Sequence, residues 1–419
     1  MAKRSPSVGF ILATLAIDAL GFGMIVPIVP DLVRRLSHES ASGASIWVGA
    51  LLAVFSTAQF VAAPILGGLS DRFGRRPVLL ISLSGICTNY LLLAWAPSLA
   101  WLFVGRLIAG ATAANVSAAT AYIADVTPPQ RRAQRFGLVG ATFGLGFVLG
   151  PALGGVLGAY GLRLPFLAAA GLAFCNLLYG LAVLPESLPR ERRRPFDWRR
   201  ANPVGSLTVV LSDPAFFRLG LTWCCAWFAL GALQSSFVLS NNLRFGWGTR
   251  ENGFALAAVG VSQAVVQGLL VRRIVPTLGE RRAALTGYAL AACAYSAFAL
   301  APAGWAIYLG VALQSFGAIA GPAVQAMISA RAGPDRQGEA QGVLASMQGL
   351  TAIISPLVTG WLFGAFTGPG APVHLPGAPF LLAVLTYAVA FEAIRGVPRT
   401  TAGSPGPLPQ REGSRIGAE

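Results

Sequence analysis

Two ionisable side chains lie within long apolar segments of this chain, where a charge is costly. Asp18 stands in LAIDALGFGMIVPIVP, and Arg106 stands in FVGRLIAGATAANVSAATAYIAD. A charged side chain at the centre of a bilayer costs at least about 2.5–3.5 kcal/mol on insertion scales, so such groups usually face a cavity and have a role. The two residues are therefore the first candidates for proton or ion chemistry.

Asp18 is followed by residues that thin and bend a helix. Gly21 and Gly23 lie one turn on, and Pro27 and Pro30 disrupt the outer end of the segment. Desolvation favours the neutral form of a carboxyl group in such a setting, which suits a group that binds and releases protons. We predict that Asp18 binds a proton or another cation. The alternative is a carboxylate that polar neighbours or a helix N-terminus hold to stabilise a bend.

Arg106 keeps its charge at any relevant pH. Gly110 and Ser117 follow it on nearly the same helical face. We predict that the guanidinium sets the protonation of a nearby carboxylate or binds an anionic group. The alternative is that Arg106, within two turns of its helix start, extends to the outer interface.

Aromatic and amide side chains that share a helix face indicate a substrate path. Amides fix the orientation of a ligand, and aromatic faces accept planar apolar molecules. The candidates for substrate binding are Trp223, Trp227 and Gln234 on one segment, Gln263 and Gln267 beside Gly260 on the next, and Gln325 and Gln348 further along. The alternative is that these amides hold helices together and the tryptophans face lipid.

The composition predicts that these residues lie in lipid. Of 419 residues, 55% are hydrophobic and 11% are charged, with a mean hydropathy of +0.64, whereas about a quarter are charged in soluble domains. A span needs about 20 apolar residues, and the unbroken runs exclude a strand barrel, which uses alternating segments of about 10 residues. We therefore predict an all-α membrane protein with twelve transmembrane helices, at residues 8–28, 46–69, 78–96, 99–123, 136–159, 164–184, 215–239, 252–271, 283–301, 304–328, 341–366 and 378–396.

The distribution of charge orients these helices. With a cytoplasmic N-terminus, 25 of the 31 Lys and Arg residues fall inside, and those outside are Arg34, Arg35, Arg163, Arg244 and Arg250. This positive-inside bias places both termini in the cytoplasm of a multi-pass protein of the cell (inner) membrane. It also accounts for the net charge of +15 without a nucleic-acid partner.

The sequence offers little for other classes of function. His38 and His374 have no metal-ligand spacing around them, so we predict no metal site. A phosphate-binding G-x-x-x-x-G-K-[ST] motif is missing, which argues against ATP as the energy source. No nucleophile, base and orienting group cluster by spacing, so we predict neither enzyme activity nor a cofactor.

The chain is a tandem duplication. Residues 121–155 and 326–360 match without a gap at a shift of 205 positions, which also relates Gly74 and Arg76 to Gly279 and Arg281. Tandem hydrophobic repeats are typical of secondary transporters, whose substrate site lies between the repeats. We predict two six-helix bundles, at residues 1–185 and 214–397, with a basic cytoplasmic linker at 186–213 and a disordered tail at 398–419.

The loop after the second predicted helix gathers an acid and three arginines at the cytoplasmic interface. Such groups pair with each other and with a helix end, or the arginines only orient the helices. The loop contains Gly67, Asp71, Arg72, Gly74, Arg75 and Arg76. It resembles the signature loop of the major facilitator superfamily. The resemblance implies that Asp71 and Arg75 latch the two halves on the cytoplasmic side in the outward-facing state.

Residues 146–155 contain a GxxxG spacing and a proline, which alone indicate close helix packing and a kink. The pattern, formed by Gly146, Gly150, Pro151, Gly154 and Gly155, also resembles the motif of the drug:proton antiporter branch of the superfamily. Stretches such as AYIADVTPPQRRAQRFG and PAVQAMISARAGPDRQGEAQG are similar to tetracycline efflux proteins, as is practically the whole chain. By this resemblance, Asp125 and Arg131 join the cytoplasmic gate.

The chain departs from tetracycline exporters at two positions. Those exporters carry a histidine in helix 8 and an acid in helix 9, where this chain has Gln263 and Ala291. The departure assigns proton coupling to Asp18, with Arg106.

The resemblance implies a secondary active transporter, a monomeric proton-coupled antiporter that exports tetracycline-like or other lipophilic drugs by alternating access. The alternative is an uptake carrier for a small metabolite, proton-coupled or facilitative. The 205-residue shift sends Asp18 to Trp223, Asp71 to Pro276 and Arg106 to Val311. Because the charges are not repeated, we predict proton and gating chemistry in the N-terminal half and substrate specificity in the C-terminal half.

Overall fold

The chain forms twelve membrane-spanning helical segments. The computed structural model describes residues 8–193, 195–196, 213–332 and 337–397, and in these ranges twelve helical segments are long and apolar enough to cross a membrane, as predicted. They are α1 (Val8–Ile25), α3 (Ala41–Phe73), α4 (Arg75–Trp95), α5 with α6 (Leu99–Ala111, Asn115–Val126), α7 (Pro129–Tyr160), α8 (Leu164–Val183), α9 (Pro214–Phe245), α10 with the π-helix η3 (Thr249–Val265, Val266–Leu270), α12 (Glu280–Leu300), α13 with α14 (Gly304–Gly317, Ala320–Ala332), α15 (Gln337–Thr367) and α16 (Ala378–Arg395).

Within the described ranges, three short helices lie outside these spans: α2 (Val29–Ser37), the 3-10 helix η1 (Arg190–Arg192) and α11 (Val271–Leu278). The prolines predicted to end the first span do so, because α1 stops at Ile25 and Pro30 lies in the first turn of α2. Residues 197–212 of the predicted linker and the predicted tail at 398–419 lie outside the described residues.

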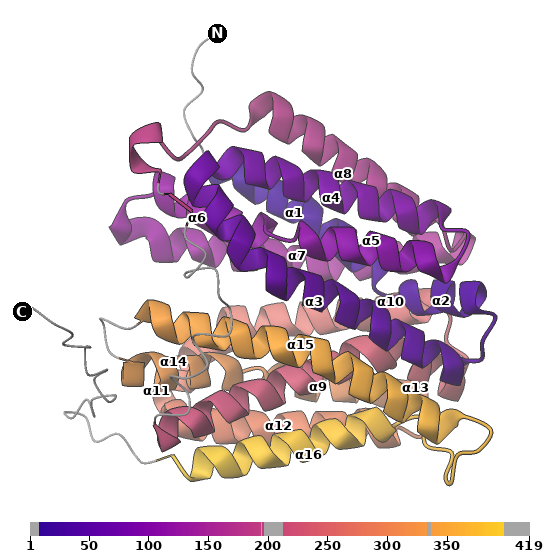
Figure 1. Cartoon of the computed structure of the whole chain (residues 1–419). Coiled ribbons are helices and arrows are strands. Elements are labelled where there is room, and N and C mark those ends of the chain that lie inside the picture. Colours follow the sequence, from indigo (N-terminus) through magenta and orange to yellow (C-terminus); the bar gives the residue numbers. More distant parts are fainter. Residues whose placement is uncertain (1–7, 194, 197–212, 333–336, 398–419) are drawn as a thin grey trace, which may run out of the picture.

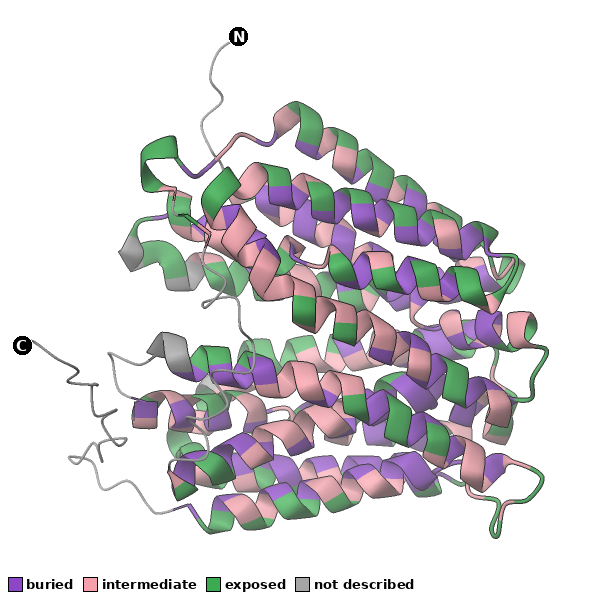
Figure 2. Ribbon diagram, viewed as in Figure 1, coloured by how far each residue is buried: buried purple, intermediate pink, exposed green. Residues whose placement is uncertain are grey.

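The helices form two groups that follow the order of the sequence. Figure 1 shows α1–α8 together in one half of the molecule, and the C-terminal helices in the other. Two helix pairs make the main contact between the halves: α3 packs on α15, and α7 packs on α10. Figure 2 shows exposed residues along the outer sides of the helices and buried residues between them. The exposed apolar side chains, such as Leu107, Trp361 and Leu385, suit a surface that meets lipid.

At the end of the molecule that carries α2, hereafter the α2 end, the halves pack backbone against backbone. A Cβ added to Gly253 would lie 2.5 Å from the Pro151 carbonyl oxygen, and one added to Gly49 would lie 2.3 Å from that of Pro356. Pro151 and Pro356 are related by the 205-residue shift, so the two contacts are counterparts. A single apolar core at this end joins N-terminal residues to Leu239 of the C-terminal half.

At the opposite end, hereafter the Gly74 end, the halves stand apart. Gly144 lies on the same face of α7 as Gly155, about three turns earlier, yet a Cβ there would meet no atom within 4 Å. The same holds for Gly140 on α7, Gly268 in η3 and Gly342 on α15. The apolar core of the N-terminal half at this end contains no residue of the C-terminal half. The molecule is therefore closed at the α2 end and open at the Gly74 end.

The duplication is visible in local backbone geometry. Gly74 and Gly279, which join the second and third helices of each half, both have positive φ angles, 110° and 75°. Each is followed two residues later by an arginine that donates to the end of the last helix of its half: Arg76 to the Leu181 oxygen at 2.7 Å, and Arg281 to the Arg395 oxygen at 2.6 Å. Here the arginines orient helices, as the simpler interpretation of the loop suggested.

Candidate functional site

Asp18 lies buried in the N-terminal half, and two amide groups hold its carboxylate. Asn115 Nδ2 donates to Oδ2 at 2.7 Å, and Asn176 Nδ2 donates to Oδ1 at 3.0 Å. Asn176 also donates to the Thr14 carbonyl oxygen on α1, which fixes the position of its amide. Within the described residues, no cation forms an ion pair with Asp18. A buried carboxylate therefore relies on neutral donors rather than on a salt bridge.

A break in the fourth span brings Asn115 to Asp18. The helix stops at Ala111 and restarts at Asn115, and the Thr112 hydroxyl donates to the Ile108 carbonyl oxygen inside the break. Asn115 is the first residue of α6, so its side chain leaves the helix at the end where unpaired backbone N–H groups favour a negative charge. The equivalent span of the second half breaks at the related position, between Gly317 and Ala320.

Arg106 lies buried on α5, with 6% of its surface exposed. Such burial does not fit the alternative in which its side chain extends to the interface. The ring of Tyr90 packs against Gly21 of the helix that carries Asp18. Arg106 forms no ion pair with Asp18 among the described side chains. The helix break also separates Arg106 from Ser117, which the sequence placed on nearly the same face.

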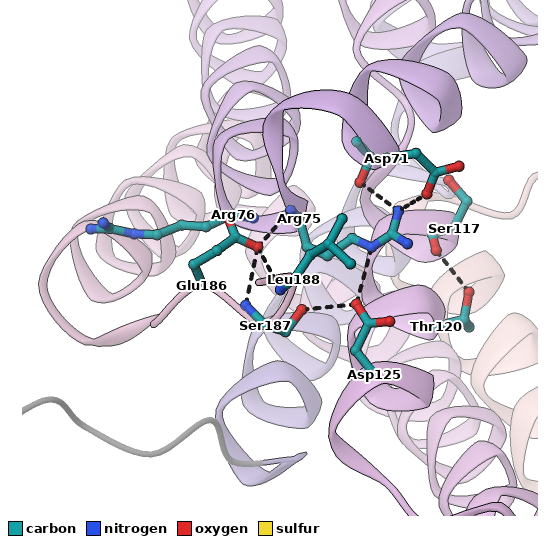
Figure 3. Close-up of polar contacts among 10 residues, drawn as sticks. Asp71, Arg75, Arg76, Ser117, Thr120, Asp125, Glu186, Ser187 and Leu188 are labelled. Atoms are coloured by element: carbon teal, nitrogen blue, oxygen red, sulfur yellow. Dashed lines mark hydrogen bonds and ion pairs between the residues drawn. The ribbon is translucent and has the colours of Figure 1, made fainter. Parts of the chain in front are cut away.

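The predicted gate residues Asp71, Arg75 and Asp125 form one cluster at the Gly74 end (Figure 3). Arg75 Nη1 donates to Asp71 at 2.5 Å, and Nε donates to Asp125 at 3.2 Å. Nη1 also donates to the Ser70 hydroxyl at 3.2 Å. These partners all belong to the N-terminal half, so the cluster in this structure connects α3, α4 and α6 rather than the two halves.

The start of the linker completes this cluster, which the sequence analysis did not anticipate. Glu186 accepts hydrogen bonds from the backbone N–H groups of Arg75 at 2.8 Å and Arg76 at 3.2 Å, and so caps the N-terminus of α4. The Ser187 hydroxyl donates to Asp125 at 3.1 Å. Figure 3 shows Glu186, Ser187 and Leu188 beside Arg75. The sequence feature that could have indicated this contact is the acid in LPES, directly after the last helix of the N-terminal half.

The other predicted gate residues lie around the cluster without joining it. Arg72 packs over the Phe73 ring at 5.1 Å. Arg131 is exposed, and its side chain makes no hydrogen bond or ion pair with the rest of the described chain. A Cβ on Gly67 would meet nothing within 4 Å, whereas one on Gly74 would collide with Glu186. Gly74 is therefore required both by its φ angle and by the approach of Glu186.

The glycines of α7 serve two different contacts. A Cβ on Gly150 would lie 2.6 Å from the Gly23 Cα, and one on Gly154 would lie 2.0 Å from the Met24 carbonyl oxygen. Gly146 likewise faces Ala19, so these three glycines pack against α1, the helix of Asp18. Gly155 instead faces Thr249 of α10 in the other half. The motif thus places α7 between the helix of Asp18 and the C-terminal half.

The predicted aromatic residues of α9 form one group. The ring centroids of Trp223 and Trp227 are 6.1 Å apart, and the buried Trp223 Nε1 has no hydrogen-bond partner among the described residues. Between Leu219 and Asn242, Gln234 is the only exposed residue of α9. Gln234 is thus the predicted residue of α9 whose side chain is accessible in this range.

The remaining predicted amides are more scattered. Gln263 is half-buried on α10, whereas Gln267 is exposed within the π-helical turn η3. A π-turn adds a residue per turn, so it alters the shared face on which the sequence placed the pair. Gln325 donates to the Gln341 side chain at 3.4 Å, and Gln348 is half-buried on α15.

Ala291, where the resemblance to tetracycline exporters implies an acid, is part of a close helix contact. It is 3% exposed, and a Cβ added to Gly317 would lie 2.9 Å from the Ala291 Cβ. Helices α12 and α13 therefore leave no room for a carboxylate at this position.

A polar network closes the α2 end across the two halves. Asn242 Nδ2 on α9 donates to Asp31 Oδ1 on α2 at 2.8 Å, and Asn252 Nδ2 donates to Asn242 Oδ1 at 2.7 Å. Burial raises the pKa of Asp31 above its usual value, although Arg34 and the Asn242 amide oppose the shift. No local pattern in the sequence indicates these residues, because the contact joins positions 211 apart.

The chain is similar to known proteins over most of its length. The model of the Major Facilitator Superfamily matches residues 11–311 and 277–416. The chain is 39% identical to the Tetracycline resistance protein, class C, of Escherichia coli, covering 94% of this chain and 97% of that protein. It is 37% identical to the class G protein of Vibrio anguillarum, covering 85% and 90%. Among solved structures, the human organic anion transporter MFSD10 aligns with a TM-score of 0.69 at 28% identity, covering 92% of this chain and 98% of that chain.

Proposed function

The chain belongs to the major facilitator superfamily and is a multi-pass transporter of the cell membrane, and from that premise we propose that it exports a tetracycline-like or other lipophilic drug in exchange for protons. The observation that carries the proposal is the buried Asp18 carboxylate. Two amides stabilise its ionised form, and the lack of a cation partner among the described residues leaves its neutral form accessible. Such a group can bind a proton on one side of the membrane and release it on the other.

We place the Gly74 end in the cytoplasm. The described arginines at this end include Arg72, Arg75 and Arg76, and the basic linker starts here. The positive-inside rule then orients both termini inward. In this orientation the structure is open to the cytoplasm, the side from which an exporter takes up its cargo.

Transport then follows from rocking of the two bundles, residues 1–185 and 214–397, about the site between them. In the open state Arg75 is occupied by Asp71 and Asp125 of its own half. Closure of the Gly74 end would bring the C-terminal half to this cluster, where the side chain of Asp71, 49% exposed, can accept a new partner. This is the latch that the resemblance implied, and a monomer is sufficient for it.

The residues proposed to line the cargo path suit a molecule that is largely apolar. Trp223 and Trp227 offer ring faces, and Gln234 offers an accessible amide. Gln263, Gln267 and Gln348 lie on other elements, and each offers a separate polar contact to the cargo. The curated relatives are tetracycline resistance proteins, which makes tetracycline the first compound to test.

A second candidate function is an uptake carrier for a small metabolite. The close packing of Ala291 against Gly317 favours it, because the acid of tetracycline exporters has no place there. The two functions differ in the direction of proton movement when cargo is added to vesicles. When cargo is added outside inside-out vesicles with an acidic interior, release of protons from the vesicles supports the antiporter. Entry of protons together with the cargo supports the uptake carrier.

The test is drug accumulation in cells that express the wild type, Asp18→Asn or Glu392→Gln. Glu392 is an exposed acid on α16 that pairs only with Arg395 among the described residues, so it serves as the matched control. We expect the wild type and Glu392→Gln to lower accumulation of tetracycline or another amphiphilic drug, with the effect abolished by a proton uncoupler. Asp18→Asn should lose it. Asp18→Asn cells that export like wild type would refute coupling through Asp18.

A further inference from the structure

The helix of Asp18 exposes one large side chain to the interior of the molecule. Between Phe10 and Ile28, all within the described residues, Phe22 is the only exposed residue of the chain. It follows Asp18 by four positions and so lies on the same face of α1. The carboxylate of Asp18 is enclosed by α6 and α8, so Phe22, one turn further on, marks where α1 becomes accessible.

Phe22 pairs with a second exposed ring on α7. The centroids of Phe22 and Phe147 are 5.8 Å apart, and their planes meet at 75°. The lipid-facing stripe of α7 carries Leu145, Leu149 and Leu153, all exposed. Phe147 lies on the opposite side of the helix, in a stripe with Gly140 and Gly144, where added Cβ atoms would meet open space. The exposed surface of Phe147 therefore faces the space between the halves rather than lipid.

Phe147 also lies beside the C-terminal half. A Cβ on Gly260 of α10 would be 2.8 Å from the Phe147 carbonyl oxygen. The 205-residue shift relates Phe22 to Trp227, a half-buried aromatic residue of α9. Repeats related by an axis along the membrane normal place equivalent positions at similar depth on opposite walls. Each half thus contributes an aromatic residue at the same position of its first helix.

Resting on the proposed function, we propose that Phe22 and Phe147 form an aromatic corner that binds the cargo one turn from Asp18 and determines its specificity. Two rings at a steep angle offer one face and one edge, which together fit a flat conjugated ring system. The cargo class is therefore a molecule with a planar ring system. Trp227, at the related position of α9, offers a further ring to the same cargo.

The experiment measures transport of tetracycline and of ethidium, two flat fluorescent molecules, into inside-out vesicles driven by a proton gradient. The variants are Phe22→Leu and Phe147→Leu, which keep apolar volume but lose the ring, and Phe22→Tyr, which keeps the ring. The control is Phe174→Leu, because Phe174 is an exposed ring of α8 with no ring partner among the described residues.

We expect KM to rise about threefold to tenfold in Phe22→Leu and Phe147→Leu, with kcat within about twofold of wild type, because a lost aromatic pairing weakens binding by about that factor. Phe22→Tyr and Phe174→Leu should keep the wild-type KM. Leucine variants with an unchanged KM would overturn the aromatic corner while leaving the proposed function intact. Wild-type vesicles that carry neither compound would instead overturn the proposed function. Melting temperatures of all variants identify any that fail to fold.

Discussion

At the scale of single residues, the N-terminal half carries two polar sites of opposite design. Asp18 is buried and held by the amides of Asn115 and Asn176, so both protonation states of its carboxyl group can be accommodated. Asp71 is half exposed and paired with Arg75. A buried group without a counter-charge suits proton exchange, whereas an exposed ion pair suits a contact that is made and broken.

Replacing Asp71 should separate transport from folding. In Asp71→Asn, Arg75 keeps its contact with Asp125 at 3.2 Å, and loss of an exposed ion pair costs only about 0–1 kcal/mol of stability. We expect normal insertion and a melting temperature near that of wild type, with transport lowered at least about tenfold. Rates are measured in reconstituted vesicles, with Glu392→Gln as the control for an exposed ion pair. Wild-type rates in Asp71→Asn would contradict a latch at this residue.

At the scale of elements, α7 shows how a glycine pattern assigns a helix to two neighbours. Gly150 and Gly154 allow α1 to approach, and Gly155 allows α10 to approach from the other half. Pro151, between these contacts, removes one backbone N–H from the helix ladder. Helix α7, which packs against the helix of Asp18, is therefore also in direct contact with the C-terminal half.

A methyl group should be harmful on one face of α7 and harmless on another. Gly154→Ala puts a Cβ 2.0 Å from the Met24 carbonyl oxygen, whereas Gly144→Ala puts one where no atom lies within 4 Å. Overpacking of this kind costs about 1–3 kcal/mol, and an alanine in open helix surface costs nothing. We expect Gly154→Ala to lower the melting temperature in detergent and Gly144→Ala to leave it unchanged or raise it. Equal melting temperatures would show that α1 and α7 are not packed as described.

At the scale of the whole molecule, closure of the α2 end depends on contacts that join the halves. Some are backbone contacts at Gly49 and Gly253, and one is the hydrogen bond from Asn242 to Asp31 at 2.8 Å. The buried carboxylate makes this closure sensitive to pH. Since the contact exists only when the α2 end is closed, it stabilises the state that opens toward the Gly74 end.

Asn242→Ala should shift the molecule away from this state. A hydrogen bond to a charged group contributes about 1.5–3 kcal/mol, so the ratio of closed to open α2 ends should fall by about tenfold or more. Spin labels at Glu39 and Val373, exposed residues on the two halves, report the separation of that end. Ser37→Ala is the control. An unchanged distance distribution in Asn242→Ala would show that this contact does not stabilise the closed α2 end.

The same labels test the pH dependence. Closure raises the pKa of Asp31 through burial, so the closed state binds a proton more tightly than the open one. Protonation of Asp31 stabilises the closed α2 end fully at pH values below the usual pKa of about 3.9. This stabilisation is lost as the pH rises through the raised pKa of the closed state. Wild type should therefore open at this end as the pH rises through that window, and Asp31→Asn should not respond in that window.

The sequence was a good guide to everything that depends on local pattern. Apolar runs predicted the twelve spans, and Asp18 and Arg106 were identified because a charge in such a run is rare. The charged loop predicted that its acid and arginines pair with each other, and Asp71 does pair with Arg75 across the turn between α3 and α4. The sequence did not indicate hydrogen-bond partners that lie far apart along the chain. Asn115, Asn176, Glu186 and Asn242 are ordinary polar residues until folding brings them to a carboxylate or a helix end.

By itself, the sequence determined that the chain lies in lipid, how many helices span the membrane, that the two halves are a duplication, and which charged residues stand within apolar segments. Hydropathy and residue spacing can be read from the linear chain without knowledge of its packing. Only the tertiary structure decided that the fourth span breaks to deliver Asn115, that Gly155 faces the other half, and that the molecule is closed at the α2 end and open at the Gly74 end. These features depend on which helix faces lie against each other. Packing between segments more than a hundred residues apart sets that arrangement, and no local pattern encodes it.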